Sequence, residues 1–334
     1  MFGTIEGTGF EVIDPSFAAC FIGHAKVERL WTGGRWVEGP AYFAAGRYLI
    51  WSDIPNNRIM RWDETDGSVS LFREPSNNSN GHTVDAQGRL ISCEHLTRCV
   101  TRTEFDGSIK VLADQWQSKR LNSPNDVVVK SDGSVWFTDP SYGILMDYEG
   151  KRAESEIGAC HVYRYDPETS DIQAVATDYV KPNGLAFSPD ERELFIADTG
   201  ATHMLGGPAH IRRHKVNSDG RTLGPGEVFS ECSAGLYDGF RFDKDGRVWT
   251  SAEDGVHCLD PKGNLIGKIK IPEIVSNVCF GGPKLNRLFI TATTSMYSVF
   301  STLMGLIDRR WLKCMELIFG LTLWHRMGSI AVPS

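Results

Sequence analysis

Short runs of apolar residues alternate with turn-forming clusters of Asp, Gly, Asn and Pro along most of the chain. This pattern indicates β-strands joined by tight turns. The three-to-four-residue spacing of amphipathic helices is missing from most of the sequence before about residue 300. The pattern therefore predicts an all-β fold.

The strand pattern recurs in six units. Each unit has a polar residue beside a short apolar strand, a turn rich in Asp or Gly, and a second apolar strand. The six units begin at Glu38, Asn80, Asn125, Asn183, Asp238 and Asn277. Successive starts lie 42, 45, 58, 55 and 39 residues apart, and further strand-like pieces follow each start. This spacing is typical of four-stranded propeller blades, so we predict a six-bladed β-propeller.

The two ends of the repeat region differ. The last unit has three strands before Phe300, and an unassigned strand at 25–31 precedes the first unit. We predict that this early strand becomes the outer strand of the last blade and closes the ring. The predicted organisation is an N-terminal extension at 1–24, the propeller at 25–300 and an atypical apolar tail at 301–334.

The tail has apolar residues such as Leu303, Ile307 and Trp311 at helical spacing. We expect a helix that covers one propeller surface. The alternatives are a helix for a membrane surface or self-association, and a tail without fixed structure.

Composition narrows the range of partners. The formal net charge is −7, with 35 Lys plus Arg against 42 Asp plus Glu and no basic run, so nucleic acid and anionic membranes are not expected as main partners. No apolar stretch is long enough for a transmembrane helix. The eight cysteines are scattered without zinc-type spacing, and the N-terminus lacks a secretory pattern, which favours reduced cysteines and a cytoplasmic location. The sequence leaves the oligomeric state open.

In a propeller, the inner strands of all blades begin around one mouth of the central channel. The six unit starts should therefore form an inner ring of carboxylates and carboxamides. A second set, fifteen residues further along each unit, should meet the same mouth and comprises Asp53, His95, Pro140, Asp198, Glu253 and Ala292, with Asp139 just before Pro140.

Oxygen donors that converge in a channel suit a hard divalent cation, and calcium is the ion we expect. Zinc is disfavoured because the inner ring contains no Cys or His, although zinc, magnesium and manganese remain alternatives. Individually, Asn and Asp at strand starts also serve to cap turns.

At these residues the sequence resembles the family of senescence marker protein (regucalcin), gluconolactonase and luciferin-regenerating enzyme, and especially the bacterial gluconolactonases. The resemblance spans about residues 27–300. It rests on the stretches WVEGPAYF, KRLNSPNDVVV with WFTDPSYG, KPNGLAFSPD, and YDGFRFD. The family is a six-bladed propeller with one axial divalent metal, usually calcium.

The resemblance implies metal ligation by Glu38, Asn183 and Asp238, with Asn125 facing both metal and substrate. Asp238 also matches the family's proposed general base. The resemblance further implies that Arg120, in the KRLNSPN stretch, contacts the substrate.

We therefore expect metal-dependent hydrolysis of a sugar lactone, a small-molecule substrate, by water. No Gly-x-Ser-x-Gly elbow suggests a covalent nucleophile. Asn80, His95 and Asp139 are the further expected substrate contacts, while His95 could instead hold a neighbouring loop and Asp139 could fix a turn. Two alternative functions are an organophosphate or phosphoester hydrolase on the same site, and a calcium-binding propeller without turnover.

Overall fold

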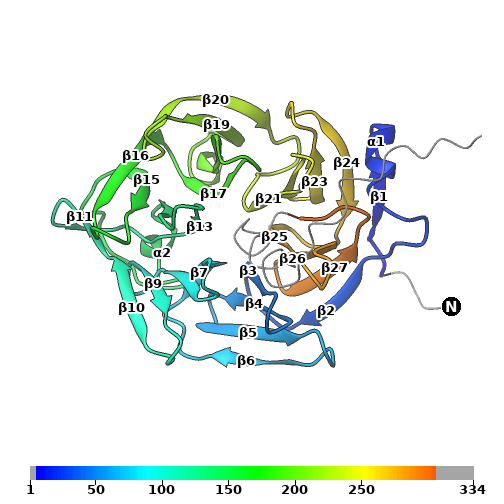
Figure 1. Cartoon of the computed structure of the whole chain (residues 1–334), viewed down its shortest axis with the longest axis horizontal. Helices are drawn as coiled ribbons and strands as arrows, with labels where there is room; N and C mark the ends of the chain where they lie inside the picture. Colours follow the sequence, from blue (N-terminus) through cyan, green and yellow to red (C-terminus); the bar gives the residue numbers. More distant parts are fainter. Residues whose placement is uncertain (1–4, 306–334) are drawn as a thin grey trace, which may run out of the picture.

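The computed structural model describes residues 5–305, which form six antiparallel sheets arranged as a ring (Figure 1). Each sheet is one blade, with its first strand nearest the axis and its last strand at the rim. The predicted six-bladed β-propeller is confirmed.

The first three blades follow the chain order from the inside outward. Blade 1 contains β3 (Val37–Phe43), β4 (Tyr48–Asp53), β5 (Arg58–Asp63) and β6 (Val69–Arg73). Blade 2 contains β7 (Ser79–Val84), β8 (Leu90–Glu94), β9 (Cys99–Thr103) and β10 (Ile109–Ala113). Blade 3 contains β13 (Val127–Val129), β14 (Val135–Asp139), β15 (Cys160–Tyr165) and β16 (Ile172–Tyr179).

The other three blades complete the ring. Blade 4 contains β17 (Pro182–Phe187), β18 (Glu193–Asp198), β19 (His210–Val216) and β20 (Leu223–Glu231). Blade 5 contains β21 (Phe240–Phe242), β22 (Val248–Ala252), β23 (Gly255–Leu259) and β24 (Leu265–Lys270). Blade 6 contains β25 (Val275–Gly281), β26 (Arg287–Ala292), β27 (Ser295–Phe300) and β2 (Glu28–Thr32).

Short elements occupy the connections. They are the hairpin β11 (Gln115–Trp116) and β12 (Lys119–Arg120), the helix α2 (Tyr142–Leu145) and the 3₁₀ turn η1 (Gly200–Thr202).

The ring closes through the last blade. Strand β2 pairs antiparallel with β27, with Glu28 opposite Ser298 and Thr32 opposite Ser295. The predicted closure by the early strand is therefore confirmed. One sheet joins both ends of the propeller, and closure of the ring leaves each blade flanked by two neighbours.

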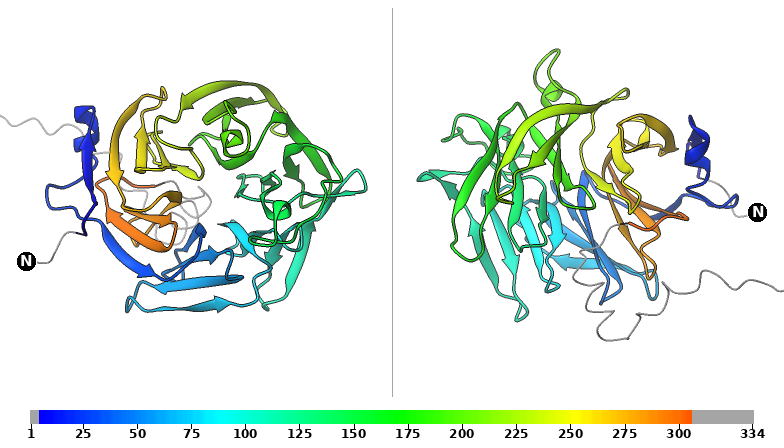
Figure 2. Two further views of the ribbon diagram at one scale, coloured as in Figure 1. Left: turned by 180° about the vertical axis from the view of Figure 1, so that it is seen from behind. Right: turned by 45° about the horizontal axis from the view of Figure 1, so that its top comes forward.

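The N-terminal segment packs against blade 5, a contact that the sequence pattern did not predict. Strand β1 (Gly9–Val12) pairs with β24 as a fifth strand, and helix α1 (Pro15–Ala18) follows it along the outer edge of the blade (Figures 1 and 2). Phe17 and Cys20 are fully buried there, in one apolar cluster with Trp249 of β22.

The core lies between the faces of neighbouring blades. One cluster combines Trp51 of β4 with Phe289 and Met296 of blade 6. Inner strands are mostly buried, whereas outer strands such as β10 expose much of their length. Burial therefore decreases from the inner to the outer strands. The inner strands, which carry the predicted site, lie in the most buried part of the blades.

The described chain ends beside the N-terminal segment. The backbone N–H of Thr302 donates to the carbonyl of Cys20 at 2.8 Å, and Gly305 forms a β-bridge with Asp243. The predictions for the apolar tail concern mainly residues 306–334, which lie outside the described residues. No helix within residues 5–305 has the length and apolar character needed to cross a membrane.

Candidate functional site

Polar residues from five blades line one cavity of about 520 Å³, which we call the donor cavity. The unit starts that line it are Glu38, Asn80, Asn125, Asn183 and Asp238. The sixth, Asn277, lies immediately behind Glu38 and donates from Nδ2 to the Glu38 carboxylate at 2.9 Å. The structure thus brings the predicted inner ring together.

Direct backbone contacts between neighbouring inner strands hold this ring. The N–H of Gly81 donates to the carbonyl of Asn125 at 2.7 Å, and that of Gly184 donates to the carbonyl of Asp238 at 3.1 Å. A Cβ at Gly184 would stand 2.1 Å from the Asp238 carbonyl oxygen. A side chain larger than hydrogen would push the blades apart, so the glycine after Asn183 sets the narrow spacing of the donors.

Glu38 is buried at the start of β3. Its Oε2 accepts hydrogen bonds from the N–H of Gly39 and from Asn277. Burial, followed by the nearby Asp126 carboxylate, raises the pKa of Glu38 to about 8. Oε1 has no hydrogen-bond partner among the described residues, so it is open to a ligand.

Asp238 faces the same cavity from the segment just before β21, the inner strand of blade 5. Its backbone N–H donates to Ser251 Oγ at 2.8 Å, whereas its carboxylate accepts no hydrogen bond from the described residues. Burial raises the pKa of Asp238 well above its ordinary value, and repulsion from Glu38 and Asp126 adds to the shift. Two ionised carboxylates here therefore need a compensating cation.

The carboxamides also leave oxygen atoms available. Asn183 donates from Nδ2 to Thr199 Oγ1 at 3.2 Å, which leaves its Oδ1 as the free end. The side chain of Asn125 makes no hydrogen bond within residues 5–305 and lines the cavity.

Asn80 is oriented by His95. Burial lowers the pKa of His95 to about 4, so the ring is neutral. Its Nδ1–H can donate to the carbonyl of Glu149 at 3.0 Å while Nε2 accepts from Asn80 Nδ2 at 3.2 Å. Asn80 Oδ1 is then left buried with no partner among the described residues.

This donor set fits a calcium-type cation. Every available atom is a carboxylate or carboxamide oxygen, from Glu38, Asn125, Asn183 and Asp238, and calcium prefers oxygen ligands in a loose shell completed by water. Across residues 5–305, no three His, Cys, Asp or Glu side chains group as metal ligands, so the two carboxylates depend on the carboxamides to complete the set.

Most of the second predicted set does not line the donor cavity. Asp139 accepts from the N–H groups of Asn122 and Ser123, both at 2.8 Å, and is fully buried. Asp198 accepts in the same way from Val180 and Lys181. These carboxylates fix the loop that leads into the inner strand of their own blade.

Asp53 is buried and accepts from the N–H of Arg35 at 3.0 Å and from the side chain of Arg58. Of the second set, Glu253 lines the cavity. Arg120 lies on the exposed hairpin β11–β12, where its guanidinium donates to the carbonyl of Thr97 at 3.0 Å. The structure does not bring Arg120, Asp139 or His95 to the cavity wall, although His95 contacts Asn80, which does line it.

Loops, short helical turns and the first residue of β25 supply lining residues that the repeat pattern did not single out, namely Trp36, Tyr142, Glu149, Thr199, Thr202, Leu236, Ile274 and Val275. Tyr142 links its own segment to the segment that contains η1. Its hydroxyl lies 2.7 Å from Thr199 Oγ1 and 3.0 Å from Thr202 Oγ1. The repeat comparison aligns strands, so it gave no signal for Glu149 or Leu236. Trp36 and Thr199 stand within two residues of aligned positions, which could have marked them.

Comparisons with known proteins agree with this architecture. Gluconolactonase of Zymomonas mobilis is 31% identical over 294 residues, covering 81% of this chain and 80% of its own. Pentonolactonase XacC of Haloferax volcanii is 28% identical over 270 residues, covering 78% of this chain and 82% of its own. The solved structure of a gluconolactonase from Xanthomonas campestris superposes with a TM-score of 0.82 at 36% identity, covering 89% of this chain and 95% of its own.

The family model described as the SMP-30/Gluconolactonase/LRE-like region matches residues 36–294, which include all six inner strands. The expected resemblance is therefore confirmed, and the chain belongs to the SMP-30/gluconolactonase/LRE-like family.

Proposed function

We propose that the protein is a lactonase that hydrolyses a sugar lactone with the help of one divalent cation, calcium in the first instance, bound in the donor cavity. Glu38, Asn183 and Asp238 would hold the cation, and Asn125 would face both cation and substrate. The observation that carries the proposal is the ring of carboxylate and carboxamide oxygens without protein partners in one cavity. The gluconolactonase and pentonolactonase names of the relatives support the substrate class.

Hydrolysis adds water across the ester bond of the lactone ring. The water oxygen bonds to the carbonyl carbon, the bond from that carbon to the ring oxygen breaks, and the ring oxygen leaves as a hydroxyl. A bound cation would supply Lewis-acid polarisation of the carbonyl oxygen. Asp238 would accept the proton of the attacking water at a carboxylate oxygen, since that carboxylate has no protein donor occupying it, and would then return a proton to the leaving ring oxygen.

The other residues position the substrate. Asn125 can donate from its amide nitrogen to the developing oxyanion when its oxygen is not a ligand. Asn80 is proposed to contact a ring hydroxyl, with His95 holding it in place from behind. Trp36, Tyr142 and Leu236 form an apolar part of the wall that excludes water from the reacting atoms.

The charge of the cavity weighs against anionic substrates. Glu38, Glu149, Asp238 and Glu253 line it, and no Lys, Arg or His of residues 5–305 is among the lining residues. A phosphomonoester would find no cationic side chain there, whereas an uncharged lactone meets hydroxyl-binding carboxylates and carboxamides.

The test is a substrate panel. Protein freed of metal and then supplied with calcium, zinc, magnesium or manganese is assayed on glucono-1,5-lactone, a pentonolactone and the neutral organophosphate paraoxon. Protein-free blanks correct for spontaneous ring opening. We expect lactone turnover to exceed paraoxon turnover with every supporting metal, and faster paraoxon hydrolysis, or no lactonase activity with any of the ions, would overturn the proposal.

A further inference from the structure

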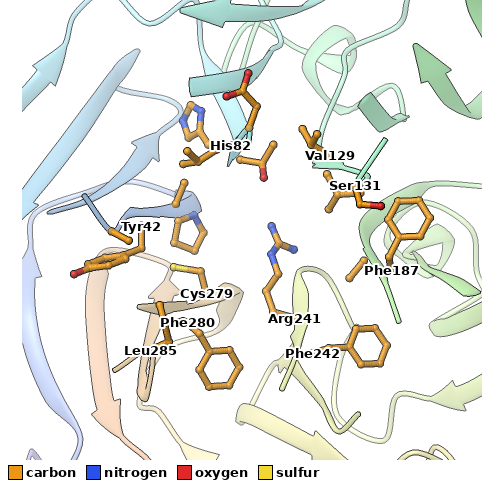
Figure 3. A pocket seen from close by; sticks show the side chains of 18 of the residues that line it. Tyr42, His82, Val129, Ser131, Phe187, Arg241, Phe242, Cys279, Phe280 and Leu285 are labelled. Atoms are coloured by element: carbon orange, nitrogen blue, oxygen red, sulfur yellow. The ribbon is translucent and has the colours of Figure 1, made fainter. Parts of the chain in front are cut away.

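A second cavity lies at the opposite end of the inner strands. It has a volume of about 490 Å³, and we call it the apolar cavity (Figure 3). Its wall includes Phe43, Val84, Val129, Phe187, Phe242 and Phe280. A cavity of this size with mostly apolar walls and a few directed polar groups is typical of a site for a small molecule.

One cation reaches into this cavity. The guanidinium of Arg241, from β21, points toward the middle of the space between Val129, Phe187 and Phe280 (Figure 3). Its Nη1 donates to the carbonyl of Phe240 at 2.7 Å and lies 3.4 Å from Asp126 Oδ2. Within residues 5–305, Nε and Nη2 make no hydrogen bond, so the edge of the guanidinium that carries these two atoms is available.

Other ionisable groups at the wall are already engaged. His82 lies 2.7 Å from Ser52 Oγ and 2.8 Å from Ser92 Oγ through its two ring nitrogens. Asp85 accepts from the Arg89 guanidinium at 2.8 Å. At the rim, Glu191 accepts from the N–H of Ser131 at 2.8 Å, and Asp190 accepts from Ser188 Oγ at 2.7 Å.

The Nε–Nη2 edge matches one chemical group in particular. Its two parallel N–H donors fit the two oxygens of a carboxylate, and such bidentate pairs are stronger than neutral hydrogen bonds. The surrounding Phe and Val side chains suit an alkyl or aryl body, which gains free energy when it leaves water. A wholly apolar ligand would instead bury the guanidinium donors without partners, at a cost.

We propose that the apolar cavity is a second ligand site, separate from the donor cavity, for a small amphipathic monocarboxylate whose carboxylate pairs with the Nε–Nη2 edge of Arg241. The inference does not depend on the proposed lactonase activity, because it rests on residues at the other end of the inner strands.

The test uses the full chain and calorimetric titration with three probes of equal length: octanoate, octan-1-ol and octylammonium. Arg241→Gln removes the charge, Arg241→Lys keeps the charge but loses the paired donors, and Val129→Trp fills the cavity while leaving Arg241 in place. Arg192→Gln is the matched control, since Arg192 is a highly exposed cation near the rim and does not line the cavity.

Octanoate should bind the wild-type protein more tightly than octan-1-ol, and octylammonium should bind weakest. Arg241→Gln should weaken octanoate binding by about 10- to 100-fold, as expected for lost hydrogen bonds to a charged group. Arg241→Lys should weaken it less, Val129→Trp should weaken octanoate and octanol together, and Arg192→Gln should change neither.

Three results would overturn the proposal: no octanoate binding below millimolar concentration, equal affinity for octanoate and octan-1-ol, or unchanged octanoate affinity in both Arg241→Gln and Val129→Trp. Thermal unfolding of each variant checks that it is folded. If Arg241→Gln does not fold, the wild-type probe comparison and Val129→Trp still decide the question.

Discussion

The two ends of the inner strands carry opposite chemistry at a fixed offset. Four residues beyond each unit start that faces the donor cavity stands a residue that lines the apolar cavity: Tyr42, Val84, Val129, Phe187 and Phe242. The same five inner chain segments therefore present oxygen donors at one end and mainly apolar groups at the other.

The two ends of the propeller differ in the residues that line their cavities, and this difference suits them to different ligands. At the donor end, the close backbone contacts at Gly81 and Gly184 bring polar side chains together around the axis. At the apolar end, bulky side chains such as Phe187 and Phe242 line an open cavity. The two cavities have similar volumes, so the difference lies in their lining: clustered oxygen donors suit a cation, whereas apolar walls suit an apolar body.

One ion pair lies between the two ends. Asp126 follows the donor Asn125 in sequence, and its carboxylate lies 3.4 Å from Arg241 of the apolar cavity. The Asp126 carboxylate raises the pKa of Glu38, and the Arg241 guanidinium lowers it as a smaller contribution. A charged group at the apolar cavity therefore influences the protonation of Glu38 in the donor cavity.

The largest expected effect tests the chemistry of the donor end. Asp238→Asn keeps the size and one oxygen ligand but cannot accept a proton, so turnover of a lactone should fall by about 10²- to 10⁴-fold at saturating metal. Turnover measured across a calcium titration separates the two roles of Asp238. Full recovery of the rate at high calcium would remove Asp238 from the role of general base.

A smaller effect on metal affinity distinguishes Glu38, a proposed metal ligand, from Asn277, which donates a hydrogen bond to it. Glu38→Gln removes one of the two proposed anionic ligands and should weaken metal binding more than Asn277→Ala does. Loss of Asn277, which donates to Glu38, should cost the ~10- to 100-fold that is typical of outer partners of metal ligands. Metal affinity of both variants is measured by calorimetry, and an unchanged affinity in Glu38→Gln would show that Glu38 is not a ligand.

A change confined to the apolar end should leave lactone hydrolysis intact. Val129→Trp is expected to leave kcat/KM essentially unchanged, because Val129 lines the apolar cavity and not the donor cavity. A large loss of kcat/KM with an unchanged thermal transition would show that the two ends are coupled and that the two cavities do not act independently.

The smallest expected effect concerns residues 306–334, which the structure does not describe. Truncation after Gly305 keeps the hydrogen bond from Thr302 to Cys20 and the bridge between Gly305 and Asp243. The shortened protein should therefore retain its thermal transition and lactonase activity. A collapsed transition would show that residues 306–334 contribute to the stability of the propeller.

Repeat comparison predicted the parts of the fold that recur. The six inner strands and the closing pair of β2 with β27 followed from strand spacing and from one strand left over at each end. The pairing of β1 with β24 could not be predicted in this way. It depends on the exposed outer edge of blade 5 and on burial of Phe17, which no repeat position encodes.

For the site too, the sequence predicted the residues that recur in every unit. Polar residues recur at the start of each unit, so the alignment identified all six unit starts together, and the family resemblance selected Glu38, Asn183 and Asp238 among them. The alignment also grouped Asp139 and Asp198 with the mouth, because they recur as regularly, but their carboxylates are occupied by backbone N–H groups of the preceding loops. Position in a repeat gives the end of the strand, whereas hydrogen-bond partners decide whether an atom is available.

We propose that the oxygen donors around Glu38 and Asp238 hold one divalent cation needed for lactone hydrolysis. The most direct measurement is lactonase activity of protein stripped with a chelator, with metal content followed by elemental analysis during stepwise return of calcium. The account predicts loss of activity in the stripped protein and recovery that is complete at one ion per chain. Full activity in protein shown to be free of metal would contradict it.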